Sequence, residues 1–190
     1  MSALAREPYG PRGDPGRHRS LAELRSGLQA LAPEPMIRGS LAGIVRRLAD
    51  GSRERLTEAE LCTEHGLVGD GWTRRRPRDP EAQIAVMRHA VAELIGNGQP
   101  LGLSGDNLYV DLDISADNLP PGTHLRVGEA LVEVTPKPHN GCAKFHARFG
   151  DDALRFVQAA TTRRLNLRGI FWRVIESGRI TAGAEIIVLR

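Results

Sequence analysis

The segment with the clearest chemical potential surrounds Cys142. It follows a run typical of a β-strand, and its two prolines and one glycine favour a rigid, non-helical loop. Positive charge near a thiol lowers its pKa and populates the thiolate, the form that attacks, carries sulfur or ligates a soft metal. Cys142 is therefore the candidate catalytic residue and metal ligand. The cationic or titratable side chains that flank it are Lys137, His139, Lys144, His146 and Arg148.

Other interpretations of Cys142 remain open at this point. A free cysteine is often a small buried hydrophobe. The spacing H-x2-C-x3-H over His139, Cys142 and His146 offers three zinc ligands, although it matches no usual paired pattern and lacks a fourth ligand. Either histidine could also activate the thiol as a nucleophile. Cys62 is the contrasting cysteine, because it lies between acidic residues in a segment where we expect an amphipathic helix.

Two short loops combine glycine with small polar residues. They are Gly66–Asp70 (GLVGD) and Gly105–Leu108 (GDNL). Glycine lets the backbone approach a ligand closely, and Asp and Asn supply directional hydrogen-bonding groups. Asp70 and Asn107 are therefore candidate ligand-binding residues. The alternative is ordinary turn chemistry, in which such side chains bond their own backbone.

A basic run, Arg74-Arg75-Arg76-Pro77-Arg78, follows Asp70 closely. Such a run is usually a solvated loop, but it could also steer an anionic ligand toward a nearby site. Arg75, Lys137, His139 and Lys144 are the candidate cationic contacts for such a ligand.

Composition excludes several classes of protein. The chain has 190 residues, a net charge of +3 and two cysteines, too few for a disulfide framework. No apolar run approaches the roughly 18 residues of a membrane span, and the N-terminus lacks the apolar stretch of a secretory signal. Two Trp, two Tyr and four Phe supply a poor stacking platform, so we do not expect nucleic-acid binding. We expect a cytoplasmic protein with free thiols.

The elements that must position these residues begin after a tail. Residues 1–19 are rich in Gly, Pro and Arg, which predicts disorder. A capping box at Ser20–Glu23 and leucines at helical spacing then predict a short amphipathic helix up to Pro33. That helix could pack on the domain's own surface or bind a partner. Residues 1–35 are thus expected to be a tail plus one helix.

From residue 36 the pattern is mainly β, with a few short helices. Short strands joined by Gly and Pro turns favour a closed or nearly closed β-barrel-like domain over residues 36–190. A hairpin around Gly128 is the clearest local signal. We expect strands at 37–45, 83–87, 107–112, 124–127, 130–135, 168–176 and 184–189, and helices at 57–62, 88–95 and 151–160.

Taken in order, these motifs resemble the MOSC domain, the module found at the C-terminus of molybdenum cofactor sulfurases and as stand-alone bacterial proteins. The resemblance covers about residues 36–190. It rests on Gly66–Asp70, Gln83–Val86 and Gly105–Leu108, then Leu119–Gly122, Leu125–Ala130, Val132–Thr135 leading to Cys142, Arg168–Phe171 and Gly178–Ile180.

The resemblance implies a β-barrel-like fold with a cysteine at the ligand site. In this family, which is also associated with pyridoxal phosphate proteins, the cysteine carries sulfur or ligates the molybdenum of a molybdopterin-type cofactor. Cofactor-binding relatives reduce N-hydroxylated compounds with an electron-donating partner. Cys142 inherits this position, and the nearby basic residues could meet the phosphate of the anionic pterin.

Three functions follow as competing expectations. The first is a molybdenum-dependent oxidoreductase served by an electron-donor reductase. The second is a sulfur carrier, in which Cys142 receives sulfur from a desulfurase. The third is a β-barrel module that holds a ligand or partner without turnover.

Overall fold

Seven strands close into a barrel because β1 (Arg38–Arg47) pairs with strands on both of its sides. The computed structural model describes residues 10–190. All neighbours in the ring are antiparallel except β5 and β6, which run parallel. The expected mainly β, barrel-like fold is therefore confirmed. From β1 the ring continues through β11 (Glu185–Leu189), β7 (His124–Val127), β8 (Ala130–Val134), β9 (Ile170–Glu176), β5 (Ile84–Arg88) and β6 (Leu108–Asp111).

Alternating side chains divide the residues of the barrel between two apolar cores. In β6, Leu108 and Val110 point into the barrel, whereas Tyr109 between them belongs to a second cluster outside it. The strand period of two produces this separation. The barrel interior is filled by branched aliphatic residues and the fully buried Trp172.

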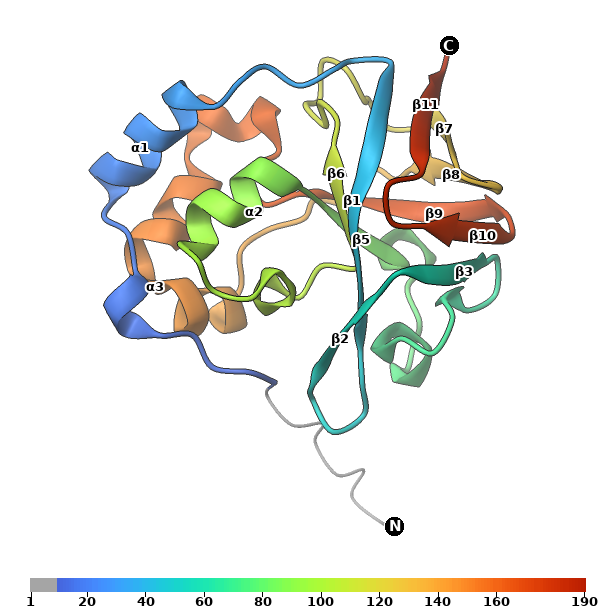
Figure 1. Ribbon diagram of the computed structural model, residues 1–190, viewed down its shortest axis with the longest axis horizontal. Helices are drawn as coiled ribbons and strands as arrows, with labels where there is room; N and C mark the ends of the chain where they lie inside the picture. Colours follow the sequence, from blue (N-terminus) through green and yellow to red (C-terminus); the bar gives the residue numbers. More distant parts are fainter. Residues whose placement is uncertain (1–9) are drawn as a thin grey trace.

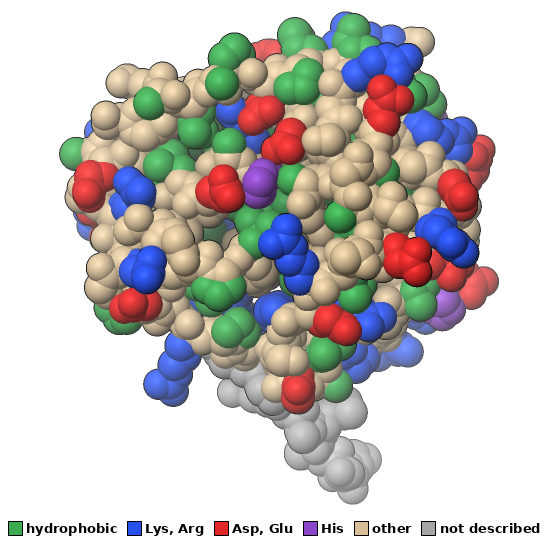
Figure 2. Space-filling view, viewed as in Figure 1, with side chains coloured by type: hydrophobic (Ala, Val, Ile, Leu, Met, Phe, Trp, Pro, Cys, Tyr) green, Lys and Arg blue, Asp and Glu red, His purple; other side chains and the backbone are tan. Residues whose placement is uncertain are grey.

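Three helices cover one side of the barrel, where they bury the second cluster (Figure 1). They are α1 (Leu21–Ala30), α2 (His89–Gly96) and α3 (Ala143–Gln158). Acidic and basic side chains are interspersed over the face shown in Figure 2. Among the helices of residues 10–190, none combines the length and apolar character that a bilayer crossing requires.

The helix expected after Ser20 forms and packs on the domain itself. The Ser20–Glu23 capping box is present, and Leu24 is fully buried against α2 and α3. Residues 10–19 also have a defined place, in contrast to the disorder expected for 1–19. Arg17 donates to Asn97 O at 3.0 Å, and His18 Nε2 donates to Arg148 O at 3.1 Å. Residues 1–9 lie outside the described residues.

A small sheet corrects the helix expected at 57–62. That segment is β3 (Glu58–Cys62), which pairs with β4 (Gly66–Leu67) and β10 (Gly178–Thr181). Leu61 is fully buried and Ala59 packs partly buried against the barrel core, so alternate residues face inward. The strand period therefore prevails over the capping-box pattern of residues 57–60, which had suggested a helix. β2 (Arg53–Leu56) extends β1 at the edge of the barrel.

The helix expected at 151–160 begins earlier. Helix α3 starts at Ala143 and continues to Gln158, with a break at Gly150, whose φ of 85° is left-handed. The capping acids Asp151 and Asp152 therefore start only its second half. The missed first half carries Lys144 and Arg148, and buries Phe145 and Phe149. Short 3-10 turns occupy Pro15–Arg17, Gly71–Arg74, Pro80–Ala82, Leu101–Ser104 and Ala160–Leu165.

Candidate functional site

Cys142 is exposed at the start of α3, at the end of the loop that leaves β8. The loop is anchored where it begins, because Thr135 Oγ1 donates to Glu81 O at 2.7 Å and Thr135 N–H to Phe171 O at 2.9 Å. Cys142 O accepts the first helical hydrogen bond, from His146 N–H at 2.9 Å. The thiol is thus accessible on a fixed segment of backbone, and it is not a buried packing residue.

Lys144, in the first turn of α3, places a positive charge close to the Cys142 thiol. Partial burial, together with the charges of Arg148 and Arg75, lowers the pKa of Lys144, and the charge of a Cys142 thiolate acts in the opposite direction. Arg53 also contributes to the lowering of this pKa. Groups from β2, from the basic run and from α3 are therefore close enough to repel one another beside Cys142.

Arg53 and Arg148 are the deepest members of this cluster. Burial, followed by the charges of Arg148 and Arg47, lowers the pKa of Arg53 to about 10. Both guanidinium groups lie close to Gly10, where a Cβ would be 2.9 Å from Arg53 Nη2 and 3.1 Å from Arg148 Nη2. Arg148 is 3 % exposed and donates to Leu103 O at 2.9 Å and Pro11 O at 3.2 Å. We call Arg53, Arg75, Lys144 and Arg148 the cation cluster.

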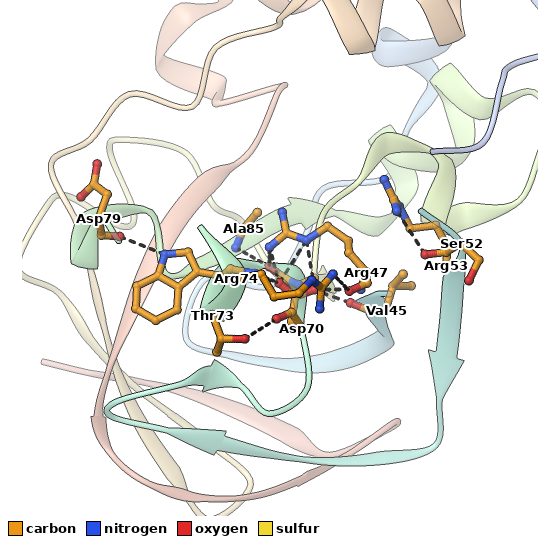
Figure 3. Close-up of polar contacts among 11 residues, drawn as sticks. Val45, Arg47, Ser52, Arg53, Asp70, Thr73, Arg74, Asp79 and Ala85 are labelled. Atoms are coloured by element: carbon orange, nitrogen blue, oxygen red, sulfur yellow. Dashed lines mark hydrogen bonds and ion pairs between the residues drawn. The ribbon is translucent and has the colours of Figure 1, made fainter. Parts of the chain in front are cut away.

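Asp70 and Asn107, predicted as ligand contacts, both bind Arg47. Figure 3 shows Asp70 beside Arg47. Asp70 accepts from Arg47 Nη2 at 2.5 Å and Nε at 3.0 Å, and from Trp72 N–H at 2.9 Å. Burial opposes ionisation, but the hydrogen bonds and charge of Arg47 hold the pKa of Asp70 below its usual value. Asn107 Oδ1 accepts from Arg47 Nη2 at 3.2 Å and from Ala85 N–H at 3.1 Å.

This network gives Asp70 and Asn107 a positioning role. They join β1 to the two loops that the sequence analysis singled out, and they hold the turn that leads into the basic run. Within that run, Arg74 Nη2 donates to Arg47 O at 3.1 Å, which ties the run back to β1. Arg75 is thereby placed near Lys144.

Lys137 has a different environment from Lys144. Its ammonium group is 2.5 Å from Asp79 Oδ2, and the hydrogen bond and charge of that carboxylate raise the pKa of Lys137. The structure thus places Lys137 in an ion pair with Asp79, and it is not among the charges that act on Lys144.

His139 is buried rather than presented as a cation. The centres of the His139 and Phe171 rings lie 4.2 Å apart, and His139 Nδ1 is 3.7 Å from Asp106 Oδ1. Burial and the charge of Arg168 lower the pKa of His139 to about 3, although Asp106 opposes this shift. His139 is therefore neutral at physiological pH. In residues 10–190, no three His, Cys, Asp or Glu side chains converge as metal ligands, so the zinc alternative gains no support.

Comparison with known proteins defines the class. The family model of the MOSC domain matches residues 80–187, and the chain belongs to the MOSC domain family. A search of the curated proteins with the sequence found no match.

Solved structures agree on the fold. The YuaD protein from Bacillus subtilis is 16 % identical, with a TM-score of 0.61 over 80 % of this chain and 96 % of that one. YiiM from Escherichia coli is 21 % identical, with a TM-score of 0.53 over 80 % of this chain and 70 % of that one. YiiM from Geobacillus stearothermophilus is 16 % identical, with a TM-score of 0.50 over 83 % of this chain and 76 % of that one.

Sequence reasoning missed Arg53 and gave Arg148 only a flanking role. Arg53 lies in a strand far from Cys142 along the chain, so no local spacing could have linked the two. Arg148 lies one helical turn after Lys144, and recognition of the first half of α3 would have placed both on neighbouring turns. Arg47, the partner of Asp70, was also missed, and Arg168, the partner of Asp106, was named only as part of the Arg168–Phe171 motif.

Proposed function

We propose that Cys142 and the cation cluster form the binding site of a phosphate-bearing, molybdopterin-type cofactor, with the Cys142 thiolate as the molybdenum ligand. The observation that carries the proposal is the gathering of cationic side chains beside an exposed thiol. The charges of Arg53, Arg75 and Arg148 all act on the Lys144 ammonium group, so a polyanion placed there would meet several positive charges.

The donor set fits this group chemically. A thiolate is a soft ligand suited to a thiophilic metal. Arginine and lysine bind phosphate through charge-assisted hydrogen bonds, and Arg53 has a buried Nε without a hydrogen-bond partner among the described residues. When bound, the cofactor would supply redox chemistry at the metal, so the proposed activity is reduction of N-hydroxylated compounds with an electron-donor reductase in the cytoplasm.

The protein's own groups have separate tasks in this proposal. Cys142 must lose its proton before it can ligate the metal, and the neighbouring cations favour the thiolate. Arg53 and Arg148 lie deeper than Lys144, so we assign the phosphate to them and the outer part of the ligand to Lys144 and Arg75. The Asp70–Arg47–Asn107 network positions the loops around the site.

Sulfur transfer is the second candidate, and the exposure of Cys142 favours it. A thiolate that a partner can reach could attack the outer sulfur of a desulfurase persulfide. The S–S bond of the donor breaks, the donor leaves as a thiolate, and Cys142 holds the new persulfide. This function needs an accessible thiol but no cation cluster.

Metal and sulfur analysis of protein purified from a cofactor-producing host tests the two candidates. Molybdenum near one per chain, lost in Cys142→Ser, is the expected result. Protein without molybdenum but with labile sulfur on Cys142 would support sulfur transfer instead. Protein with neither, after incubation with cofactor and with a desulfurase, would contradict both and leave a binding module.

Titration of the cofactor assigns the cations. Lys144→Ala and Arg53→Gln should each weaken binding by roughly tenfold to a hundredfold, because a charged hydrogen bond is worth about 1.5–3 kcal/mol. Arg126→Ala is the matched control, since Arg126 pairs with Glu176 on the barrel surface. Equal affinity of all three variants would contradict the assignment.

A further inference from the structure

A cavity of about 530 Å³ lies between the loop before Cys142 and the segment that joins α3 to β9. The loop contributes Pro138, His139 and Asn140 to the lining. The joining segment contributes Arg163, Asn166, Leu167, Arg168 and Gly169. Lys144, Arg75, Arg53 and Arg148 do not line it. The cavity is therefore separate from the cation cluster, and the Cys142 function does not account for it.

The charge of the cavity is positive. Its lining includes Arg163 and Arg168 but no Asp or Glu. Arg168 is compensated, because its Nη1 lies 2.9 Å from both carboxylate oxygens of Asp106. Among the described residues no carboxylate pairs with Arg163, whereas the next residue, Arg164, pairs with Asp117. Arg163 thus gives the cavity an uncompensated cation.

Two residues of the lining, His139 and Arg168, each have a buried nitrogen, Nδ1 and Nε, without a hydrogen-bond partner among residues 10–190. Their side chains are only 9 % and 7 % exposed. Such groups are costly to leave unsatisfied, and in native proteins they usually have a partner, which can be water or a ligand.

Both side chains are held in place. His139 packs on Phe171, and the Arg168 guanidinium lies 4.9 Å from the centre of the Phe145 ring. The Asp106 carboxylate near His139 Nδ1 favours a proton on that nitrogen, which leaves Nε2 as an acceptor. The cavity therefore presents fixed polar groups beside the apolar side chains of Val157 and Leu167, the usual make-up of a small-molecule site.

We propose that this cavity binds a small organic anion, with its carboxylate or phosphate group near Arg163 and the Arg168 guanidinium and its apolar body against Val157 and Leu167. The site is independent of the cation cluster and does not require a bound cofactor.

Chemical-shift mapping with benzoate as the probe tests this inference. Benzoate should shift the Arg168 Nε–H and Gly169 N–H signals, and benzamide, its uncharged isostere, should bind about tenfold more weakly because it lacks the charge-assisted hydrogen bond. A phenyl phosphate titration then distinguishes the two anion classes by their relative affinities. Equal binding of benzoate and benzamide, or shifts confined to other surfaces, would overturn the inference.

Two adjacent arginines provide a matched pair of variants. Arg163→Ala should weaken benzoate binding by about three- to fivefold, as expected for an exposed charge. Arg164→Ala should leave it unchanged, because Arg164 does not line the cavity. Cys142→Ser should also leave it unchanged, so failure of the Cys142 function would not affect this result. Equal losses in Arg163→Ala and Arg164→Ala would contradict the placement of the anion.

Discussion

Arg168 and Asp106 form a buried ion pair beneath the Cys142 loop, with Arg168 Nη1 at 2.9 Å from both carboxylate oxygens. Asp106 is fully buried, and the side chain of Arg168 is 7 % exposed. The pair joins the loop before β6 to the segment before β9, and it borders both His139 and the cavity.

Loss of Arg168 should leave the buried carboxylate of Asp106 without its cationic partner. Arg168→Met is expected to lower the free energy of unfolding by about 3–5 kcal/mol, and Arg168→Met combined with Asp106→Asn by less than Arg168→Met alone. Urea titration measures both. Arg38→Ala is the control, because the Arg38–Glu185 pair is exposed and should contribute no more than about 1 kcal/mol. Similar losses for Arg168→Met and Arg38→Ala would show that the buried pair is not needed.

His139 should make stability depend on pH. The pKa of His139 is about 3 in the folded protein and 6.5 ordinarily. Between these two pH values, His139 is therefore protonated in the unfolded chain but neutral in the folded protein. The free energy of unfolding should therefore fall as pH drops below about 6.5, by up to about 1.4 kcal/mol per pH unit.

Urea titrations between pH 7 and 4.5 measure this dependence. His139→Gln should flatten it, whereas His146→Gln, at an exposed position on α3, should not. An unchanged slope in His139→Gln would mean that His139 is not buried in its neutral form.

The charges around Lys144 can be tested without any ligand. Arg75→Gln should raise the pKa of Lys144 toward its ordinary value, because Arg75 is one of the charges that lower it. Cys142→Ser should lower that pKa further, since it removes the opposing thiolate. NMR titration of the lysine side-chain signals measures both shifts, with Arg126→Gln as the distant control. If the pKa of Lys144 changes in neither variant, Lys144 does not lie close to Arg75 and Cys142.

The two cysteines should differ in reactivity. Cys142 is exposed beside cations, whereas Cys62 is half-buried in β3 between acidic neighbours. Iodoacetamide at mildly acidic pH should label Cys142 first, as located by peptide mass analysis. Preferential labelling of Cys62 would refute the assignment.

Removal of residues 1–19 should destabilise the protein, contrary to the expectation of a disordered tail. It deletes the hydrogen bonds of Pro11, Arg17 and His18 to Arg148 and Asn97. A loss of about 2 kcal/mol would lower Tm by roughly 4–8 °C in a chain of this size. Thermal unfolding of the truncated and full-length proteins makes the comparison, and equal midpoints would restore the original expectation.

Local pattern in the sequence was sufficient for most of the barrel. The hairpin of β7 and β8, the strands β1, β5, β6, β9 and β11, and the MOSC resemblance all follow from alternation, turn residues and ordered motifs, which act over short distances. In β3 the local pattern suggested a helix, and the tertiary structure decided for a strand, because burial of Ala59 and Leu61 depends on the barrel core and on pairing with β10, which is far along the chain.

The candidate site shows the same division. The sequence by itself identified Cys142, its loop and the cations near it along the chain. Only the tertiary structure showed that Arg53 lies near Lys144 and that Asp70 and Asn107 bind Arg47. It also showed that Lys137 pairs with Asp79 and that His139 packs on Phe171. Charge interactions and burial depend on distance in space, and barrel closure sets these distances by joining strands that are remote in sequence.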